Sequence, residues 1–278
     1  MRRYIYEKRY YEEAWISNAR VILRQITYDG LRRKGLTEDD LVRYDQIDHV
    51  GGIRNTQMLA DKLRFEPGMN VLDVGGGMGG AARFLAHKYG CRVKVLDLIP
   101  ERCVGGMELT RMTGLDHLVS FQAADAQCIP FKNEVFDVVW SQDCFDSIAD
   151  KGLLFRECYR VLKPGGQLIF TDHLKGQNKP VPDGIYLWPD DIDKITFEDY
   201  ERLLEGCGFR LDESIDLTYW AISVIYRVKT AILDGRGSLI LEAQGSEYYK
   251  KLVSFINSFL GYLQGGMVQY GAFQATRV

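Results

Sequence analysis

The chain has 278 residues, of which 46% are hydrophobic and 26% are charged, and its formal net charge is -3. This composition is typical of a globular protein with enough length for a core, and it offers no basic stripe that could follow the phosphates of a nucleic acid. No apolar run reaches the roughly 18 residues that a membrane span needs, and the polar, aromatic first residues are unlike a secretory signal. We therefore expect a cytoplasmic protein without nucleic-acid or membrane partners.

The cysteines and histidines give no sign of a metal site. The six cysteines form no CxxC pair, and the four histidines are scattered along the chain. These spacings are unlike those of zinc ligands, so we expect reduced thiols and no bound metal.

The first part of the chain is predicted to be helical. Residues 7–28 have a helical pattern rich in aromatic residues and arginine, and acidic residues at 38–40 open a short helix. A further helix over 53–63 ends before Pro67 and Gly68, which stop helices. We therefore interpret residues 1–64 as an N-terminal helical cap.

From residue 69 onward, short apolar strands alternate with helices. The predicted helices span 79–90, 101–114 and 153–166, and the predicted strands span 70–76, 92–98, 118–124, 134–142 and 166–173. This alternation is typical of βαβ units, and the continuous apolar runs suit strands that are covered on both faces. The fold class is therefore α/β, with a largely parallel sheet.

The pattern is less regular after residue 175. A loop is expected over 175–191, followed by a helix over 197–207 with Thr196 as its N-cap and a strand over 209–217. Residues 218–264 are mostly helical in pattern, and 267–277 alternate like a final strand.

A glycine-rich loop follows the first strand and directly precedes a helix. It contains Asp73, Gly75, Gly77 and Gly79. Glycines at such a turn allow positive φ angles and let a nucleotide-like ligand touch the backbone beside the helix N-terminus. Because Gly75, Gly77 and Gly80 also match the dinucleotide spacing, the loop alone does not choose the cofactor.

Two later acidic residues extend this predicted cofactor site. Asp97 ends the second strand, where a carboxylate can accept hydrogen bonds from both hydroxyls of a ribose. Asp125 follows the third strand, where it can accept from an adenine amino group. We assign Leu98 and Gln142 as further cofactor contacts.

This ordered set, together with the stretch VLKPGG, resembles the class I S-adenosylmethionine-dependent methyltransferases over about residues 65–175. The resemblance implies S-adenosylmethionine as the cofactor. By the same resemblance, Asp73 reaches its methionine amino group, Asp97 its ribose, and Asp125 with Ala126 its adenine. It also implies a Rossmann-like seven-stranded sheet, mostly parallel with the last strand antiparallel. The core would then comprise residues 65–217 and a final strand in 265–278.

Four further short segments resemble segments of the glycine, sarcosine and dimethylglycine N-methyltransferases: GGAARFLAHKYG, WSQDCF, TDHLKG and LQGGMVQYGAF. The resemblance implies that the insertion at 218–264 folds over the site as a second helical cap. Related amine methyltransferases often carry a histidine shortly after the WSQD-type motif. Here Asp146 or Ser147 would have to occupy its place, which leaves the substrate open.

Candidate reaction-site residues come from the end of the fourth strand, the fifth strand and the caps. The catalytic candidates are Asp146, His173 and His49. The substrate-binding candidates are Trp140, Asp143, Phe145, Trp188 and Tyr219. Packing in the core is the alternative for Trp140, because it lies within a strand.

The sequence favours methyl transfer to the nitrogen of a small amino-acid-like amine. C- or O-methylation of a prenyl or phenolic metabolite is the alternative reaction. Two other classes of protein remain as hypotheses: a nucleotide-dependent oxidoreductase and a cofactor-binding module without catalysis. Carboxylates and cation-facing aromatic rings in the pocket wall would favour an amine, whereas a long apolar cavity would favour a prenyl substrate.

Overall fold

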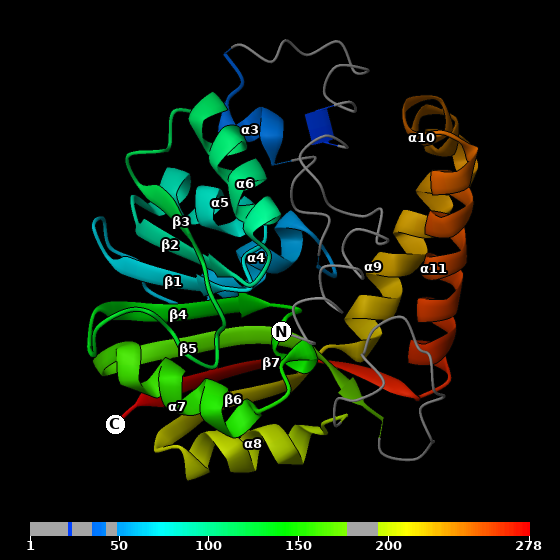
Figure 1. Ribbon diagram of the computed structural model, residues 1–278. Helices are drawn as coiled ribbons and strands as arrows, with labels where there is room; N and C mark the ends of the chain where they lie inside the picture. The colour runs from blue at the N-terminus through cyan, green and yellow to red at the C-terminus, as the bar shows by residue number, and fades with distance from the viewer. Residues whose placement is uncertain (1–21, 24–34, 43–48, 177–193) are drawn as a thin grey trace.

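A computed structural model describes residues 22–23, 35–42, 49–176 and 194–278 (Figure 1). Its centre is one seven-stranded sheet in the order β3-β2-β1-β4-β5-β7-β6. The strands are β1 (Asn70–Val74), β2 (Arg92–Asp97), β3 (Val119–Ala123), β4 (Phe136–Gln142), β5 (Leu162–Lys175), β6 (Phe209–Asp216) and β7 (Val268–Arg277).

Strand directions confirm the predicted Rossmann-like topology. The pairs β1–β2, β2–β3, β1–β4 and β4–β5 are parallel, whereas β7 runs antiparallel to both β5 and β6. The order reverses between β1 and β4, so the connections after these two strands leave toward opposite sides. A crevice for a ligand forms at the carboxyl ends of the strands at such a switch point.

Helices cover both faces of the sheet, as Figure 1 shows. Alternate residues of β1 explain this, because Val71 packs in the cluster with α4 (Ile53–Ala60) and α5 (Gly80–Tyr89). Leu72 packs in the opposite cluster with α7 (Lys151–Val161) and α8 (Phe197–Gly206). A strand alternates its side chains between two faces, so an unbroken apolar run becomes a strand buried on both sides.

Helix ends follow local signals. Thr196 accepts from the backbone N–H of Asp199 at the start of α8, and Asp199 accepts in return from the N–H of Thr196, which confirms the predicted cap. The same arrangement caps α3 (Glu38–Leu41), and α6 (Pro100–Met112) begins with proline at its first position. The predicted helix over 153–166 ends at Val161, because Pro164 cannot continue a helix and Leu162 already pairs with Phe136 in the sheet.

The region between β6 and β7 is helical, as predicted, with α9 (Thr218–Ala231), the π-helix η2 (Ile232–Arg236), α10 (Gly237–Gln244) and α11 (Ser246–Gln264). α9 and α11 share one apolar cluster, which includes Ala221, Phe259 and Tyr270. Tyr270 lies near the start of β7, so α9 and α11 pack against the end of the sheet at which β7 begins, and they stand beside that end in Figure 1.

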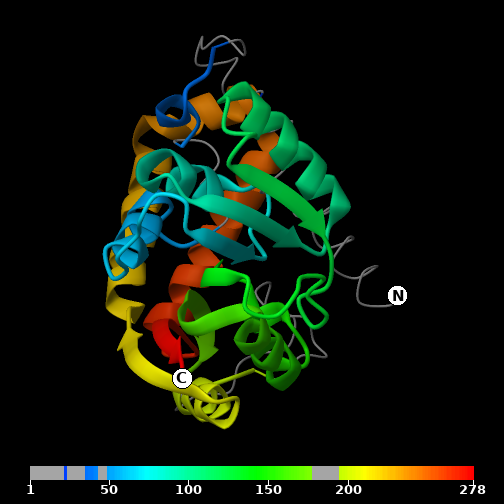
Figure 2. The ribbon, with the colours of Figure 1, turned by 90° about the vertical axis from the view of Figure 1, so that its left-hand side faces the viewer.

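Both views place the C-terminus, at the end of β7, beside β6 and α8 (Figure 2). The predicted helix over 7–28 lies outside the described residues apart from 22 and 23, which are helical. Within the described part of the chain, no helix is long and apolar enough to cross a membrane.

Candidate active site

The glycine loop after β1 adopts a conformation that larger residues could not reproduce. Gly75, Gly77 and Gly79 have φ angles of 70°, 55° and 77°. A Cβ on Gly75 would lie 2.0 Å from the sulfur of Cys144, and one on Gly77 would lie 2.3 Å from the guanidinium of Arg102. The loop can adopt this tight conformation only because these positions lack side chains.

Asp97 connects the loop to the end of β2. Its Oδ2 accepts from the backbone N–H of Gly77 at 2.9 Å, and its Oδ1 accepts from that of Ile99 at 2.9 Å. Each carboxylate oxygen can accept a second hydrogen bond. The carboxylate is thus held in place by backbone groups and retains the capacity to accept from both hydroxyls of a ribose.

Asp73 lies behind the loop and is 2% exposed. Burial, followed by the charge of Asp97, raises its pKa to about 7, although Arg83 acts in the opposite direction. Among the described residues, its Oδ2 has no hydrogen-bond partner. A buried carboxylate oxygen without a donor fits a cationic amino group, so the loop and Asp73 together fit the methionine end of the implied cofactor.

Asp125 and Ala126 lie beside Asp97, because Ala124 donates its N–H to the carbonyl of Asp97 at 3.0 Å. Asp125 accepts from the backbone N–H of Gln127 at 2.9 Å, and Ala126 is buried in the core cluster below. The ends of β2 and β3 are neighbours in the parallel sheet, so a ribose site and an adenine site at these two strand ends would be contiguous.

Asp143 joins four separate segments at the end of β4. Its φ angle of 52° is unusual for a residue with a side chain. Its Oδ1 accepts from the hydroxyls of Tyr270 at 2.6 Å and Thr171 at 3.0 Å, and its Oδ2 accepts from the N–H of Val50 at 2.7 Å. These contacts hold the carboxylate at the carboxyl edge of the sheet.

His173, on β5, lies between two carboxylates. Its Nδ1 is 3.0 Å from Oδ2 of Asp146, and its Nε2 is 3.7 Å from Oδ2 of Asp143. Burial acts to lower the pKa of His173, but Asp143, Asp146 and Asp172 together outweigh it and raise the pKa to about 9. The structure thus brings the predicted residues Asp143, Asp146 and His173 into one cluster.

Aromatic rings surround this histidine. The rings of Phe259 on α11 and Tyr270 on β7 lie 5.3 Å and 5.4 Å from the His173 ring. Trp220 on α9 stacks with Tyr270 at 6.4 Å. Helices of the 218–264 region therefore contribute directly to the walls around the carboxylates.

Gln142 and His49 meet beside the same strand end. Nε2 of Gln142 lies 3.3 Å from Nδ1 of His49, and its Oε1 accepts from Thr56 at 3.2 Å and from the indole of Trp140 at 3.1 Å. The structure thus places His49 beside Gln142 at the end of β4. The assignment of Trp140 to the substrate is corrected, since its ring is fully buried in the core and its N–H holds Gln142.

Two more substrate-binding predictions need correction, and one cannot be described. Phe145 is 0% exposed and packs against Phe155 and Phe170, because the short 3-10 helix η1 (Phe145–Ser147) turns it into the core. Tyr219 is 87% exposed, because the inward face of α9 is set by the neighbouring Trp220 and by Ala221. Trp188 lies outside the described residues.

Four residues of the cluster were not predicted: Asn55, Thr171, Asp172 and Tyr270. Asp172 is fully buried and accepts from the hydroxyl of Tyr200 at 2.5 Å, and burial followed by the charge of Asp146 raises its pKa well above the ordinary value. The segments TDH and VQYG place polar groups at the ends of two predicted strands. They were the available sequence signal for Thr171, Asp172 and Tyr270. Asn55 had none, since it lies in a helix with many polar residues.

The carboxyl groups of Asp146 and Asp172 and the ring of His173 have ligand atoms within 4.8 Å of one another, a spacing at which such groups could hold a metal ion. The sequence predicted no metal. The groups are already engaged, since His173 is hydrogen-bonded to Asp146 and Tyr200 donates to Asp172. A metal would have to displace these bonds.

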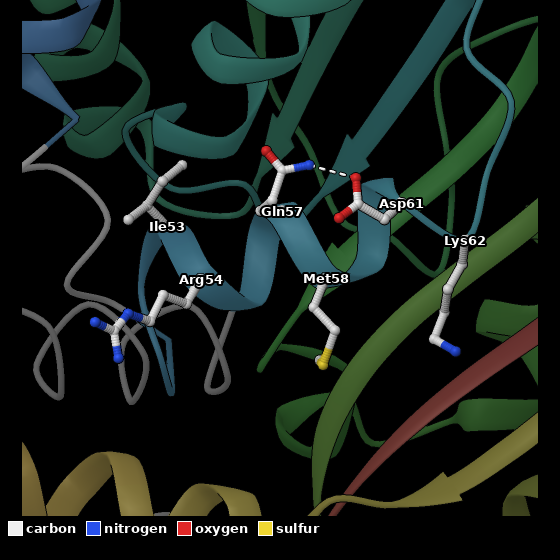
Figure 3. A pocket seen from close by; sticks show the side chains of 6 residues that line it. All are labelled: Ile53, Arg54, Gln57, Met58, Asp61 and Lys62. Atoms are coloured by element: carbon white, nitrogen blue, oxygen red, sulfur yellow. Dashed lines mark hydrogen bonds between the residues drawn. The ribbon is translucent and has the colours of Figure 1, made fainter.

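Helix α4 separates this cluster from a hollow on the surface. Its inner face carries Asn55 and Thr56, both buried. A hollow of about 610 Å³ on its other side is lined by Ile53, Arg54, Gln57 and Met58 of α4 and by Asp61 and Lys62 directly after the helix (Figure 3). Figure 3 shows the hydrogen bond from Gln57 to Asp61, which lies one helical turn later.

Comparison with known proteins identifies relatives. Residues 72–170 match the model of the methyltransferase domain. The chain is 32% identical to a glycine/sarcosine/dimethylglycine N-methyltransferase of Actinopolyspora halophila over 80% of this chain and 40% of that protein. It is 30% identical to phosphoethanolamine N-methyltransferase 1 of Zea mays over 85% of this chain and 48% of that protein. The chain thus spans less than half the length of these two relatives.

A third relative is matched over most of its length. The chain is 32% identical to a sarcosine/dimethylglycine N-methyltransferase of Halorhodospira halochloris over 74% of this chain and 75% of that protein. Among solved structures, a putative sarcosine dimethylglycine methyltransferase from Galdieria sulphuraria superimposes with a TM-score of 0.70 at 25% identity, covering 87% of this chain and 90% of that chain. The chain therefore belongs to the S-adenosylmethionine-dependent methyltransferases.

Proposed function

We propose that the protein transfers a methyl group from S-adenosylmethionine to the nitrogen of a small amine, such as an amino acid. The observation that carries this proposal is the cluster at the ends of β4 and β5. The side chains of Asp143, Asp146 and Asp172 are buried there around the imidazole of His173, and aromatic rings form the adjoining walls. Buried carboxylates and aromatic faces favour a cation over an anionic prenyl diphosphate or a neutral phenol.

The relatives support the same class of acceptor. Their names give glycine, sarcosine, dimethylglycine and phosphoethanolamine as substrates, all of which are small amines. These names do not choose among amines, and the polar cluster does not either. The proposal is therefore a small amine as a class.

The cofactor is proposed to lie across the carboxyl ends of β1, β2 and β3. Asp73 would hold the amino group of the cofactor, Asp97 its ribose hydroxyls, and Asp125 with Ala126 its adenine. The glycine loop would lie alongside the cofactor, between Asp73 and Asp97. Leu98 and Gln142 lie at the ends of β2 and β4 and are proposed as further contacts. When bound, S-adenosylmethionine supplies an activated methyl group, so the protein mainly has to align the acceptor.

A proton must leave the amine before its lone pair can react. At neutral pH the raised pKa keeps His173 protonated between Asp143 and Asp146. An ammonium group that enters among the carboxylates supplies their positive partner and lowers the pKa of His173, which then loses its own proton to solvent. The neutral ring donates from Nδ1 to Asp146 and can accept the proton of the substrate at Nε2, leaving the nitrogen lone pair free to form the new N–C bond.

Cofactor binding is the first test. Isothermal titration with S-adenosylmethionine, S-adenosylhomocysteine and NADH should show binding of the two adenosyl compounds and loss of that binding in Asp97→Ala. Asp116→Asn is the matched control, since Asp116 is exposed and lies between α6 and β3. Binding of NADH alone would favour the oxidoreductase, and cofactor binding without turnover of any substrate would favour a module without catalysis.

The acceptor is tested with a substrate panel. Glycine, sarcosine, dimethylglycine and phosphoethanolamine are compared with prenyl diphosphates and phenols, and methyl transfer is followed by mass spectrometry. We expect turnover of at least one amine, with a loss of about 10²–10⁴-fold in kcat/KM for His173→Gln and little change for Asp116→Asn. Turnover of only prenyl or phenolic compounds would overturn the proposal in favour of C- or O-methylation.

A further inference from the structure

The hydrogen bonds around Asn55 fix the orientation of its amide. Asn55 is 0% exposed on the inner face of α4. Its Nδ2 lies 2.7 Å from the hydroxyl oxygen of Tyr270 and 3.2 Å from that of Thr171. Each of these hydroxyls uses its only hydrogen to donate to Asp143, so its oxygen can only accept from Asn55. The NH₂ end must therefore face the two hydroxyls.

The other end of the same amide is an acceptor that lacks a donor. Oδ1 of Asn55 is buried, and among the described residues it has no hydrogen-bond partner. Oδ1 and Nδ2 are bonded to the same carbon, so this oxygen lies close to the hydroxyls that hold Asp143. Buried acceptors are nearly always satisfied, by protein, by water or by a ligand. The group that satisfies this one must bring an N–H or an O–H.

We propose that Asn55 is a specificity-determining residue that accepts a hydrogen bond from an N–H of the acceptor amine. This inference rests on the proposed function. In the reacting state the amine is neutral and its lone pair points toward the methyl group. A primary or secondary amine then still has an N–H for Oδ1, whereas a tertiary amine has none.

The consequence is a limit on the number of methyl groups added. A site with a buried group that hydrogen-bonds the substrate discriminates strongly against an analogue that lacks the partner, because the group is left unpaired. The enzyme should therefore methylate primary and secondary amines efficiently and stop before the quaternary product.

The test compares three amines that share one skeleton. Glycine, sarcosine and dimethylglycine are assayed separately, and kcat/KM is measured for each. In the wild type we expect kcat/KM for sarcosine to exceed that for dimethylglycine by at least about tenfold. In Asn55→Leu, which removes the acceptor at similar size, this ratio should fall toward one, mainly through loss of activity on sarcosine.

Two further variants separate the inference from a general loss of structure. Asn55→Asp keeps an acceptor at this position and should retain the preference for sarcosine. Tyr270→Phe removes a hydroxyl that holds Asp143 but leaves the carbonyl of Asn55, so it should lower activity on both amines without changing their ratio. Binding of S-adenosylhomocysteine to each variant reports whether its cofactor site is intact.

The outcomes are distinct. If the ratio of kcat/KM for sarcosine to kcat/KM for dimethylglycine is the same in the wild type and in Asn55→Leu, and both proteins are active on amines, the role of Asn55 is overturned. The proposed function then still stands. Efficient methylation of dimethylglycine by the wild type also overturns it. If Asn55→Leu does not fold, loss of the preference in Asn55→Asp overturns it instead. Absence of activity on every amine, with activity on a prenyl diphosphate or phenol, overturns the proposed function itself.

Discussion

Replacing Asp73 with asparagine should separate the stability of the empty protein from its affinity for the cofactor. Asp73 is buried behind the glycine loop, and burial followed by the charge of Asp97 raises its pKa from 3.8 to about 7. The folded protein thus holds this proton more tightly than the unfolded chain does. The stability of the wild type should then fall as the pH rises from about 4 to about 7, where the folded protein must give up the proton.

The magnitude follows from the two pKa values. A pKa rise from 3.8 to about 7 corresponds to about 4 kcal/mol of unfolding free energy, as an order of magnitude. Asp73→Asn removes this ionisation, so the variant should gain stability relative to the wild type as the pH rises. The gain should be small near pH 4 and approach its full size at pH 8.

Urea unfolding at pH 5, 6, 7 and 8 without ligand measures this difference, and other titrating groups largely cancel between the two proteins. Asp116→Asn serves as the exposed control and should show no such trend. The same Asp73 variant should bind S-adenosylhomocysteine more weakly, since that compound carries the same amino group. A difference in unfolding free energy that is independent of pH would refute the reasoning, because it would mean that Asp73 ionises normally in the folded protein.

Four other substitutions test separate features of the structure. His173→Gln should lose stability relative to the wild type mainly below pH 6.5, and the difference should shrink as the pH rises from 6.5 through about 9, because the pKa of His173 is raised; urea unfolding at pH 6 and pH 9.5 checks this, and a difference equal at both values would contradict it. Gly75→Ala should abolish cofactor binding in a titration, because its Cβ would meet the sulfur of Cys144 at a φ angle of 70°; undiminished binding would show that the loop can rearrange. Phe145→Leu should lower the unfolding free energy by about 1 kcal/mol or more, since its ring is buried among other rings, whereas Tyr219→Ser should change it by less than about 0.5 kcal/mol; the opposite order of effects would reverse the placement of these two side chains.

The cofactor end of the site could be predicted because it depends on local chain order. A strand, a glycine turn and a helix follow one another within a few residues, so Gly75 and Gly77 could be placed beside the helix N-terminus from the sequence alone. Asp97 ends the next strand, and the carboxyl ends of parallel strands meet at one edge of a sheet. The hydrogen bond from Gly77 to Asp97 is the direct result of that topology.

The acceptor end depends on residues that are far apart in the chain. Asp143 accepts from Tyr270, which is 127 residues away, and Asn55 donates to Tyr270 from 215 residues away. Nothing in the neighbourhood of these residues in the sequence signals such contacts, because they arise only when β7 inserts beside β5 and α4 covers the strand ends.

The sequence by itself determined the α/β fold class, the order of its elements and the residues of the glycine loop, because each of these follows from hydrophobic periodicity and turn chemistry over short stretches. The tertiary structure decided which of two neighbouring side chains faces the site: Trp220 rather than Tyr219 on α9, and Asp146 rather than Phe145 in η1. Helical periodicity allows either neighbour to face inward, and the choice is made by the surface against which the helix packs.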